Sequence, residues 1–218
     1  MSQIAARMKK VLAEIPADVK LVVVAKGRQP AEVIEAIDEG ALIVGENYVQ
    51  EAEEAQKQAG RRIQWHFIGH LQSNKARKAV GMFDMIQTVD SVRMAEEIDR
   101  RCAQAGKLVP VLIEVNSGRE PQKSGLMPEA VEAVVADIGS LLNIRILGLM
   151  TMGPDRLDAE GLVPYFRATR RLFESLVRAD TPHVEMKYLS MGMSDSYKVA
   201  IAEGATMVRL GRAIFGES

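Results

Sequence analysis

The sequence predicts one α/β domain, a (β/α)₈ barrel of the TIM type with an extra helix ahead of its first strand. Short apolar runs that suit buried strands alternate with segments that suit amphipathic helices, and eight such pairs follow one another along the 218 residues. Most of the runs are apolar without interruption, as is typical of parallel strands covered on both faces. A doubly wound open sheet is the alternative, because periodicity alone does not show whether a sheet closes.

The chain opens with an amphipathic helix pattern over residues 1–15, which lacks the unbroken apolar stretch of a secretory signal. The predicted strands that follow are short runs rich in apolar side chains and bounded by glycine or polar residues. In chain order they are residues 21–25, 41–45, 65–69, 85–89, 109–115, 144–150, 187–192 and 206–211.

Predicted helices fill the segments between the strands, and several of their ends carry sequence signals. Pro30 and Pro128 suit the first turn of a helix, while Gly40 and Gly139 suit the position just after the last turn. Asn47, with a glutamine three residues later, is predicted to cap a further helix. The helices are expected over residues 30–39, from 47, from 73, from 90 or 91 to 105, 128–139, 164–178 and from 195.

The composition is that of a single globular domain over residues 1–218. Hydrophobic residues make up 47% and charged residues 26%, and no Pro/Gly/Ser-rich linker interrupts the chain. The formal charge of −1 and the 5% of aromatic residues do not indicate a nucleic-acid surface. No apolar run approaches the roughly 18 residues that span a bilayer. The one cysteine, Cys102, suits a reducing cytoplasm, and a monomer is the default expectation.

Lys26 directly follows the first strand, at the carboxyl end where α/β folds carry their chemistry. Burial at this end is expected to lower the pKa of the amine and to make it a nucleophile toward carbonyl groups, as in Schiff-base formation. A lysine that simply extends from the strand end into solvent is the alternative.

The loops after the seventh and eighth strands predict a phosphate site, as such loops often do in barrels of this type. Gly211 allows backbone N–H groups to approach an anion, and the helical turn that follows directs its positive end toward it. Ser194 offers a hydroxyl from the neighbouring loop. An ordinary strand-to-helix turn is the alternative for this segment. Together with a reactive lysine, the site suggests a ligand with both a phosphate and an aldehyde.

Arg209 lies two residues before Gly211 on the same side of the strand, where a buried guanidinium needs an acceptor. The acceptor is either a buried carboxylate, Glu46 or Glu114, or the ring nitrogen of a pyridine. A guanidinium keeps its protons, so a pyridine nitrogen beside it would stay unprotonated. Such a ring is a weak electron sink, which argues against aminotransferase chemistry.

Metal binding is not expected. His66 and His70 are four residues apart, but they fall on a strand and its loop, and no cysteine or carboxylate completes a ligand set. The chain has no Ser–His–Asp order and no Walker-type loop, and no catalytic residue is assigned.

Six segments spread along the chain from residue 22 to residue 216 resemble the pyridoxal phosphate homeostasis protein family. They are VVVAKGRQP, VGENYVQEAEE, WHFIGHLQSNK, VNSGREPQKSGL, ILGLMTM and YLSMGMSDSYKVAIAEGATMVRLGRAIFG. The resemblance implies a barrel similar to the N-terminal domain of alanine racemase. It also implies that pyridoxal 5′-phosphate (PLP) is bound to Lys26 as an internal aldimine.

The resemblance further implies roles for individual residues. Ser194, Gly211 and Arg212 would hold the phosphate, Arg209 would face the pyridine nitrogen, and Asn47 would lie near the hydroxyl side of the ring.

Three positions depart from the family pattern, which commonly has Ser-Lys-Thr around the lysine. Here Ala25 and Gly27 flank Lys26, so two hydroxyls that could touch the cofactor are missing. Arg212 stands where a threonine is frequent, so its backbone N–H is a better candidate for the phosphate than its side chain.

Three functions are compatible with these features. The favoured one is a PLP-binding protein of vitamin B6 homeostasis that stores PLP or delivers it to apo-enzymes without turnover. A PLP-dependent amino-acid racemase is the alternative, but the second domain that supplies a catalytic tyrosine in racemases is not expected after Ser218. A Schiff-base aldolase would place its lysine nearer the sixth strand.

Overall fold

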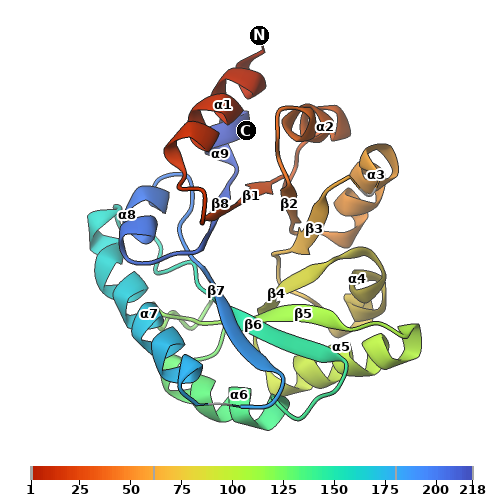
Figure 1. The fold of residues 1–218 in the computed structure, drawn as a ribbon, viewed down its shortest axis with the longest axis vertical. Coiled ribbons are helices and arrows are strands. Elements are labelled where there is room, and N and C mark those ends of the chain that lie inside the picture. Colours follow the sequence, from red (N-terminus) through yellow and green to blue (C-terminus); the bar gives the residue numbers. More distant parts are fainter. Residues whose placement is uncertain (1, 61, 180, 218) are drawn as a thin grey trace.

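Eight parallel strands form a closed barrel in the computed structural model, which describes residues 2–60, 62–179 and 181–217 (Figure 1). Each strand pairs with the next, and the first pairs with the last, with Val22 opposite Arg209. The strands are β1 (Lys20–Val24), β2 (Ile43–Glu46), β3 (Gln64–Phe67), β4 (Met85–Val89), β5 (Val109–Glu114), β6 (Ile144–Met150), β7 (Val184–Ser190) and β8 (Met207–Leu210). The predicted barrel is confirmed, and the open sheet is wrong.

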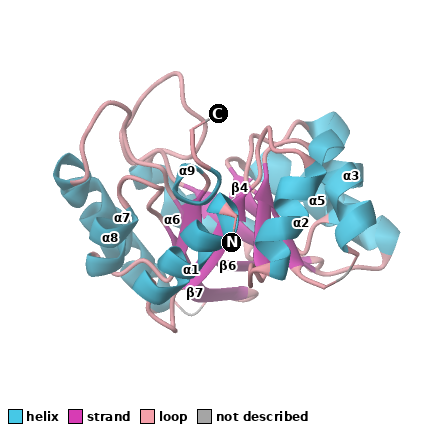
Figure 2. Cartoon of the chain, turned by 90° about the horizontal axis from the view of Figure 1, so that it is seen from above, coloured by secondary structure: helices cyan, strands magenta, loops and turns pink. Residues whose placement is uncertain are grey.

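Helices surround the ring of strands, as Figures 1 and 2 show from two directions. They are α1 (Gln3–Glu14), α2 (Pro30–Asp38), α3 (Val49–Ala59), α4 (Ala76–Met82), α5 (Val92–Ala105), α6 (Val131–Ile138), α7 (Val163–Val177), α8 (Tyr197–Ala202) and α9 (Arg212–Phe215). Short 3₁₀ turns occur at Ser73–Lys75, Pro128–Ala130 and Glu160–Leu162. Among the described residues, no helix combines the length and the apolar composition needed to cross a membrane.

The predicted extra helix is α1, which packs against α2 and α9. Ser2 caps it by accepting a hydrogen bond from Ala5 N at 3.0 Å. The prediction for this helix began at Met1, which lies outside the described residues. Among the strands, β4 and β6 match their predicted ranges, whereas β7 begins earlier, at Val184.

The apolar core has two parts. A large shell fills the space between the strands and the helices, and two small clusters lie where inward-facing side chains meet within the barrel. The residues of the two inner clusters are Val22, Ile43 and Met207 in one and Met85, Leu112 and Met150 in the other, and Tyr188 packs against both.

A polar layer lies above the inner clusters, toward the carboxyl ends of the strands. Side chains alternate along a strand, so the residue two positions after an inward-facing one faces inward again. Four strands place a buried polar residue there: Gln87 follows Met85, Glu114 follows Leu112, Ser190 follows Tyr188 and Arg209 follows Met207. This layer forms the floor of the barrel mouth.

Candidate functional site

Lys26 lies in the turn after β1, at the mouth, and has the same inward parity as Val22. Gly27 next to it has φ +68°, which suits glycine, and its N–H donates to Glu51 Oε2 at 3.0 Å. The Lys26 side chain is exposed, so the predicted desolvation of its amine is wrong. The turn lifts the residue out of the strand, and the amine is therefore accessible to a ligand.

Asn47 is half-buried after β2 and packs closely against the loop after β3. A Cβ atom on Gly69 would lie 2.3 Å from the Asn47 carbonyl oxygen, so this approach requires glycine. The predicted cap is wrong: the N-cap of α3 is Tyr48, which has an extended backbone and makes no side-chain cap hydrogen bond. Asn47, Tyr48, His70 and Lys75 are among the residues that line a cavity of about 360 Å³.

Ser194 and Gly211 meet where the loop after β7 reaches α9. The Ser194 hydroxyl oxygen accepts a hydrogen bond from Ala213 N at 3.1 Å. Gly211 packs against β1, and a Cβ atom there would lie 3.3 Å from the Val24 carbonyl oxygen. The predicted phosphate turn is therefore next to the strand that carries Lys26.

The Arg212 side chain extends away from this turn. Its guanidinium forms an ion pair with Asp195, and its Nη1 lies 3.8 Å from Glu217 Oε1. The side chain thus has acidic partners of its own, and the backbone N–H of Arg212 stays the predicted phosphate contact.

Arg209 is 5% exposed in β8 and forms part of the floor. Its Nη1 donates to Ser190 Oγ at 2.7 Å, and its Nη2 donates to the Thr151 carbonyl oxygen at 2.9 Å. Burial lowers the pKa of Arg209 to about 10, and the charge of Glu114 opposes the change. Among the described residues, no ion pair within 4.0 Å joins Arg209 to Glu46 or Glu114, so the acceptors are neutral.

A hydrogen-bonded chain continues from Arg209 across the floor. Ser190 Oγ donates to Gln87 Oε1 at 2.7 Å, and Gln87 Nε2 lies 2.9 Å from His66 Nδ1. Burial lowers the pKa of His66 to about 3, so the ring is neutral. Sequence reasoning missed Gln87, although an amide in the middle of the apolar run MIQTV was the available signal.

Two buried carboxyl groups lie at the ends of β2 and β5. Glu46 is 2% exposed, and its pKa rises to about 8 because of burial and the nearby charge of Glu51. Glu114 is 4% exposed, and its pKa rises to about 7 because burial and Asp90 outweigh the attraction of Arg209. The Oε2 atom of each has no hydrogen-bond partner among the described residues.

The described residues contain no group of three or more His, Cys, Asp or Glu side chains arranged to hold a metal ion. His66 is buried in the floor, whereas His70 is exposed and lies 3.4 Å from Asp90 Oδ2 through its Nδ1.

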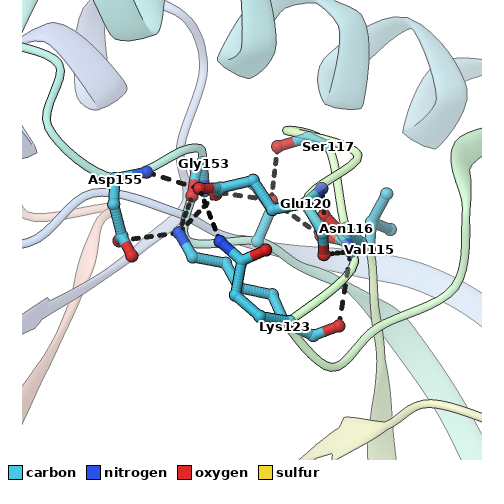
Figure 3. A network of polar contacts seen from close by, with 9 residues as sticks. Val115, Asn116, Ser117, Glu120, Lys123, Gly153 and Asp155 are labelled. Carbon is cyan, nitrogen blue, oxygen red and sulfur yellow. Dashed lines mark hydrogen bonds and ion pairs between the residues drawn. The ribbon is translucent and has the colours of Figure 1, made fainter.

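The loop after β5 folds against the loop after β6 through a polar network centred on Lys123 (Figure 3). Lys123 Nζ lies 2.7 Å from both Asp155 Oδ1 and Glu120 Oε2 and donates to the Gly153 carbonyl oxygen at 2.9 Å. Burial lowers the pKa of Lys123, but these partners outweigh burial and raise it overall. Asn116 closes the loop from within by donating to the Glu120 carbonyl oxygen at 2.9 Å.

Replacing Lys123 by methionine is expected to loosen both loops, because it removes two ion pairs and leaves carboxylates without their cation. We expect faster amide hydrogen exchange in residues 116–126 and 153–155, with a loss of about 1 kcal/mol in the free energy of unfolding. Exchange measured by mass spectrometry checks this, with Lys78→Met, which removes an exposed ion pair to Glu53, as the control. Unchanged exchange in both loops would contradict the prediction.

Comparison with known proteins places the chain among its relatives. The family profile described as the alanine racemase N-terminal domain matches residues 1–218. The pyridoxal phosphate homeostasis protein of Aquifex aeolicus strain VF5 is 42% identical over 192 residues, which cover 86% of this chain and 82% of that protein. The chain belongs to the pyridoxal phosphate homeostasis protein family.

Other members of the pyridoxal phosphate homeostasis protein family and solved structures agree with this. The protein of that name from Escherichia coli strain K12 is 36% identical over 92% of this chain and 86% of its own length. PipY of Synechococcus elongatus PCC7942, solved without PLP, is 36% identical, with a TM-score of 0.92 over 98% of this chain and 100% of PipY. PipY with PLP bound has a TM-score of 0.90 over the same shares.

The likeness to alanine racemase concerns the fold alone. The racemase of Clostridium difficile 630 is 18% identical, with a TM-score of 0.83, and the match covers 99% of this chain but 57% of the racemase. A barrel like that of alanine racemase is thus confirmed as the architecture of this family member.

Proposed function

We propose that the chain binds PLP at the barrel mouth and takes part in intracellular PLP homeostasis. The observation that carries the proposal is that an exposed lysine, Lys26, and a phosphate-type turn at Gly211 directly follow the adjacent strands β1 and β8. An amine suits an aldehyde, and backbone N–H groups at such a turn suit a phosphate. PLP carries both groups, and PipY, a homologue with 36% identity, has been solved with PLP bound.

The residues at the mouth fit this ligand. Lys26 would hold the aldehyde carbon, and Ser194, Gly211 and the Arg212 backbone would hold the phosphate. Arg209 would face the pyridine nitrogen. A guanidinium has five N–H donors, and the bonds to Ser190 and Thr151 use one donor on Nη1 and one on Nη2, which leaves donors for the ring. When bound, PLP supplies an aldehyde that condenses with an amine and loses water.

Asn47 is proposed to contact the hydroxyl side of the pyridine ring. Its position at the carboxyl end of β2 supports this role, because β2 is the neighbour of β1 in the barrel. The Gly69 contact fixes its backbone there.

We further propose that the protein holds and delivers PLP without turning over a substrate. Racemisation needs a second acid or base opposite the lysine. Two tyrosines have other contacts that speak against this role. The Tyr197 hydroxyl donates a hydrogen bond to Glu14 on α1, and Tyr188 packs against the two apolar clusters inside the barrel. Incubation of the PLP-loaded protein with L-alanine should leave its chirality unchanged, whereas turnover that is lost in Lys26→Ala would favour the racemase.

The setting of this function is also a proposal. We place it in the cytoplasm, with residues 1–218 acting as one PLP-binding domain of a monomer and with PLP-dependent apo-enzymes as recipients. The buried free thiol of Cys102 is compatible with a reducing compartment. Reactivation of an apo-enzyme by the loaded protein, with free PLP removed by dialysis, tests delivery directly.

Chemical trapping tests the attachment site. Borohydride reduction of the PLP-loaded protein should leave a pyridoxyl group on Lys26, because its amine is exposed at the mouth next to the phosphate turn. Peptide mass spectrometry locates the group. A protein that stays colourless with PLP, or a pyridoxyl group mainly on another lysine, would overturn the proposed function.

A further inference from the structure

The floor of the mouth contains a line of four polar side chains, of which the proposed function uses only Arg209. Arg209, Ser190, Gln87 and His66 come from β8, β7, β4 and β3, and all are buried. Their contacts run in one unbroken line, at 2.7 Å, 2.7 Å and 2.9 Å. Burying a polar group costs folding free energy unless the group is hydrogen-bonded. A line of four such groups is therefore expected to serve a purpose.

The guanidinium fixes the direction of the first hydrogen bond in the line, and the orientation of the Gln87 amide sets the other two. A guanidinium can only donate, so Ser190 Oγ accepts a hydrogen bond from Arg209. The Ser190 hydroxyl in turn donates to Gln87 Oε1. The amide nitrogen of Gln87 therefore faces the other way and donates to His66 Nδ1. The imidazole is neutral, and with its Nδ1 accepting from Gln87 its proton is on Nε2.

A competing partner for Arg209 is present in the same layer. Glu114 is buried on the neighbouring part of the floor, its Oε2 has no partner among the described residues, and its charge acts on Arg209. The two groups nevertheless form no ion pair within 4.0 Å among the described residues. Ser190 and the Thr151 carbonyl group hold the guanidinium away from the carboxylate.

We propose that Gln87, acting through Ser190, is a positioning residue that sets the orientation of the Arg209 guanidinium toward the pyridine nitrogen of bound PLP. This inference rests on the proposed function. Gln87 holds the Ser190 hydroxyl in its accepting orientation, and without it the hydroxyl rotates and Arg209 turns toward Glu114. The hydrogen bond between Arg209 and the ring nitrogen is then weakened or lost.

The test measures the ring nitrogen itself. PLP labelled with ¹⁵N in the pyridine ring is bound to the wild type, to Gln87→Met and to Ser190→Ala, and its ¹⁵N chemical shift is recorded by NMR. Gln87→Met keeps the side-chain volume nearly constant while removing the acceptor. Both variants should move the signal in the same direction, toward that of a pyridine without a donor, and weaken PLP affinity by about tenfold.

Two comparisons separate positioning from a general loss of packing. Met207→Leu removes another acceptor of Gln87 Nε2, the sulfur at 3.2 Å, but lies outside the link to Arg209, so it should leave the ¹⁵N signal unchanged. The double variant Gln87→Met/Ser190→Ala should shift the signal no further than one single variant, because both cut the same link. Either single variant suffices if the other fails to fold.

The outcomes distinguish the two proposals. If the wild type does not bind PLP, the proposed function fails. If the wild type binds PLP but folded Gln87→Met and Ser190→Ala keep the wild-type ¹⁵N signal and affinity, the positioning role is overturned while the proposed function stands. A signal that moves equally in Met207→Leu also overturns it, because the effect is then one of packing.

Discussion

Replacing Lys26 by alanine is expected to abolish covalent attachment of PLP and to weaken its binding by roughly 100-fold, or about 2.7 kcal/mol. The covalent bond to the aldehyde is lost, while the phosphate turn at Gly211 and the floor residue Arg209 remain. Because the Lys26 side chain is exposed, the melting temperature of the protein without ligand should change by less than about 2 °C. PLP titration followed by absorbance, together with thermal unfolding, checks both parts.

Lys20 supplies a matched control for this prediction. It begins the same strand as the one that Lys26 follows, and it is also exposed, but it lies at the opposite end of the barrel. Lys20→Ala should therefore bind PLP like the wild type. Equal losses of affinity in the two variants, or unfolding of Lys26→Ala, would mean that Lys26 acts through the fold rather than through its amine.

Replacing Glu46 by glutamine is expected to remove much of the loss of stability that the wild type suffers between about pH 5 and pH 8. The carboxyl group has an ordinary pKa of 4.5, and burial raises its pKa in the folded protein to about 8. The folded state therefore holds a proton that the unfolded state has released, and the free energy of unfolding falls as the pH rises through this window. The contribution of Glu46 is on the order of 3 kcal/mol.

Urea unfolding at several pH values measures this effect. At pH 5 the wild type and Glu46→Gln should be similar, and at pH 8 the variant should be the more stable. Glu53→Gln is the control, because Glu53 lies on the surface and pairs with Lys78. Parallel pH profiles of the wild type and Glu46→Gln would show that the carboxyl group ionises without cost, contrary to its burial.

Most of the fold could be predicted from the sequence because each strand and helix is encoded locally. The run at residues 85–89 and the run at 144–150 became β4 and β6 without adjustment. The eight strand-and-helix pairs favoured a closed barrel, but periodicity alone could not show closure, since closure depends on the pairing of β1 with β8 across the whole chain. The same apolar runs would serve an open sheet equally well.

The candidate site, too, could be predicted from the sequence only in part. Parity along the last strand predicted that Arg209 and Gly211 lie on one side, and Arg209 is buried in the floor of the mouth. Exposure of Lys26 could not be predicted, because it depends on the turn that Gly27 allows. The error at Asn47 has a similar origin: local cap signals were overridden by the close approach of Gly69, a residue from another loop.

The seam between β1 and β8 has a consequence for the protein during synthesis. Its two strands are the first and the last of the barrel, so a ribosome makes β1 well before β8. If Lys26 and the Gly211 turn hold PLP as proposed, a nascent chain would carry the amine before the turn that anchors the phosphate has been made. Stable binding of PLP would then require β8 to dock on β1, and it would mark a barrel that has finished folding.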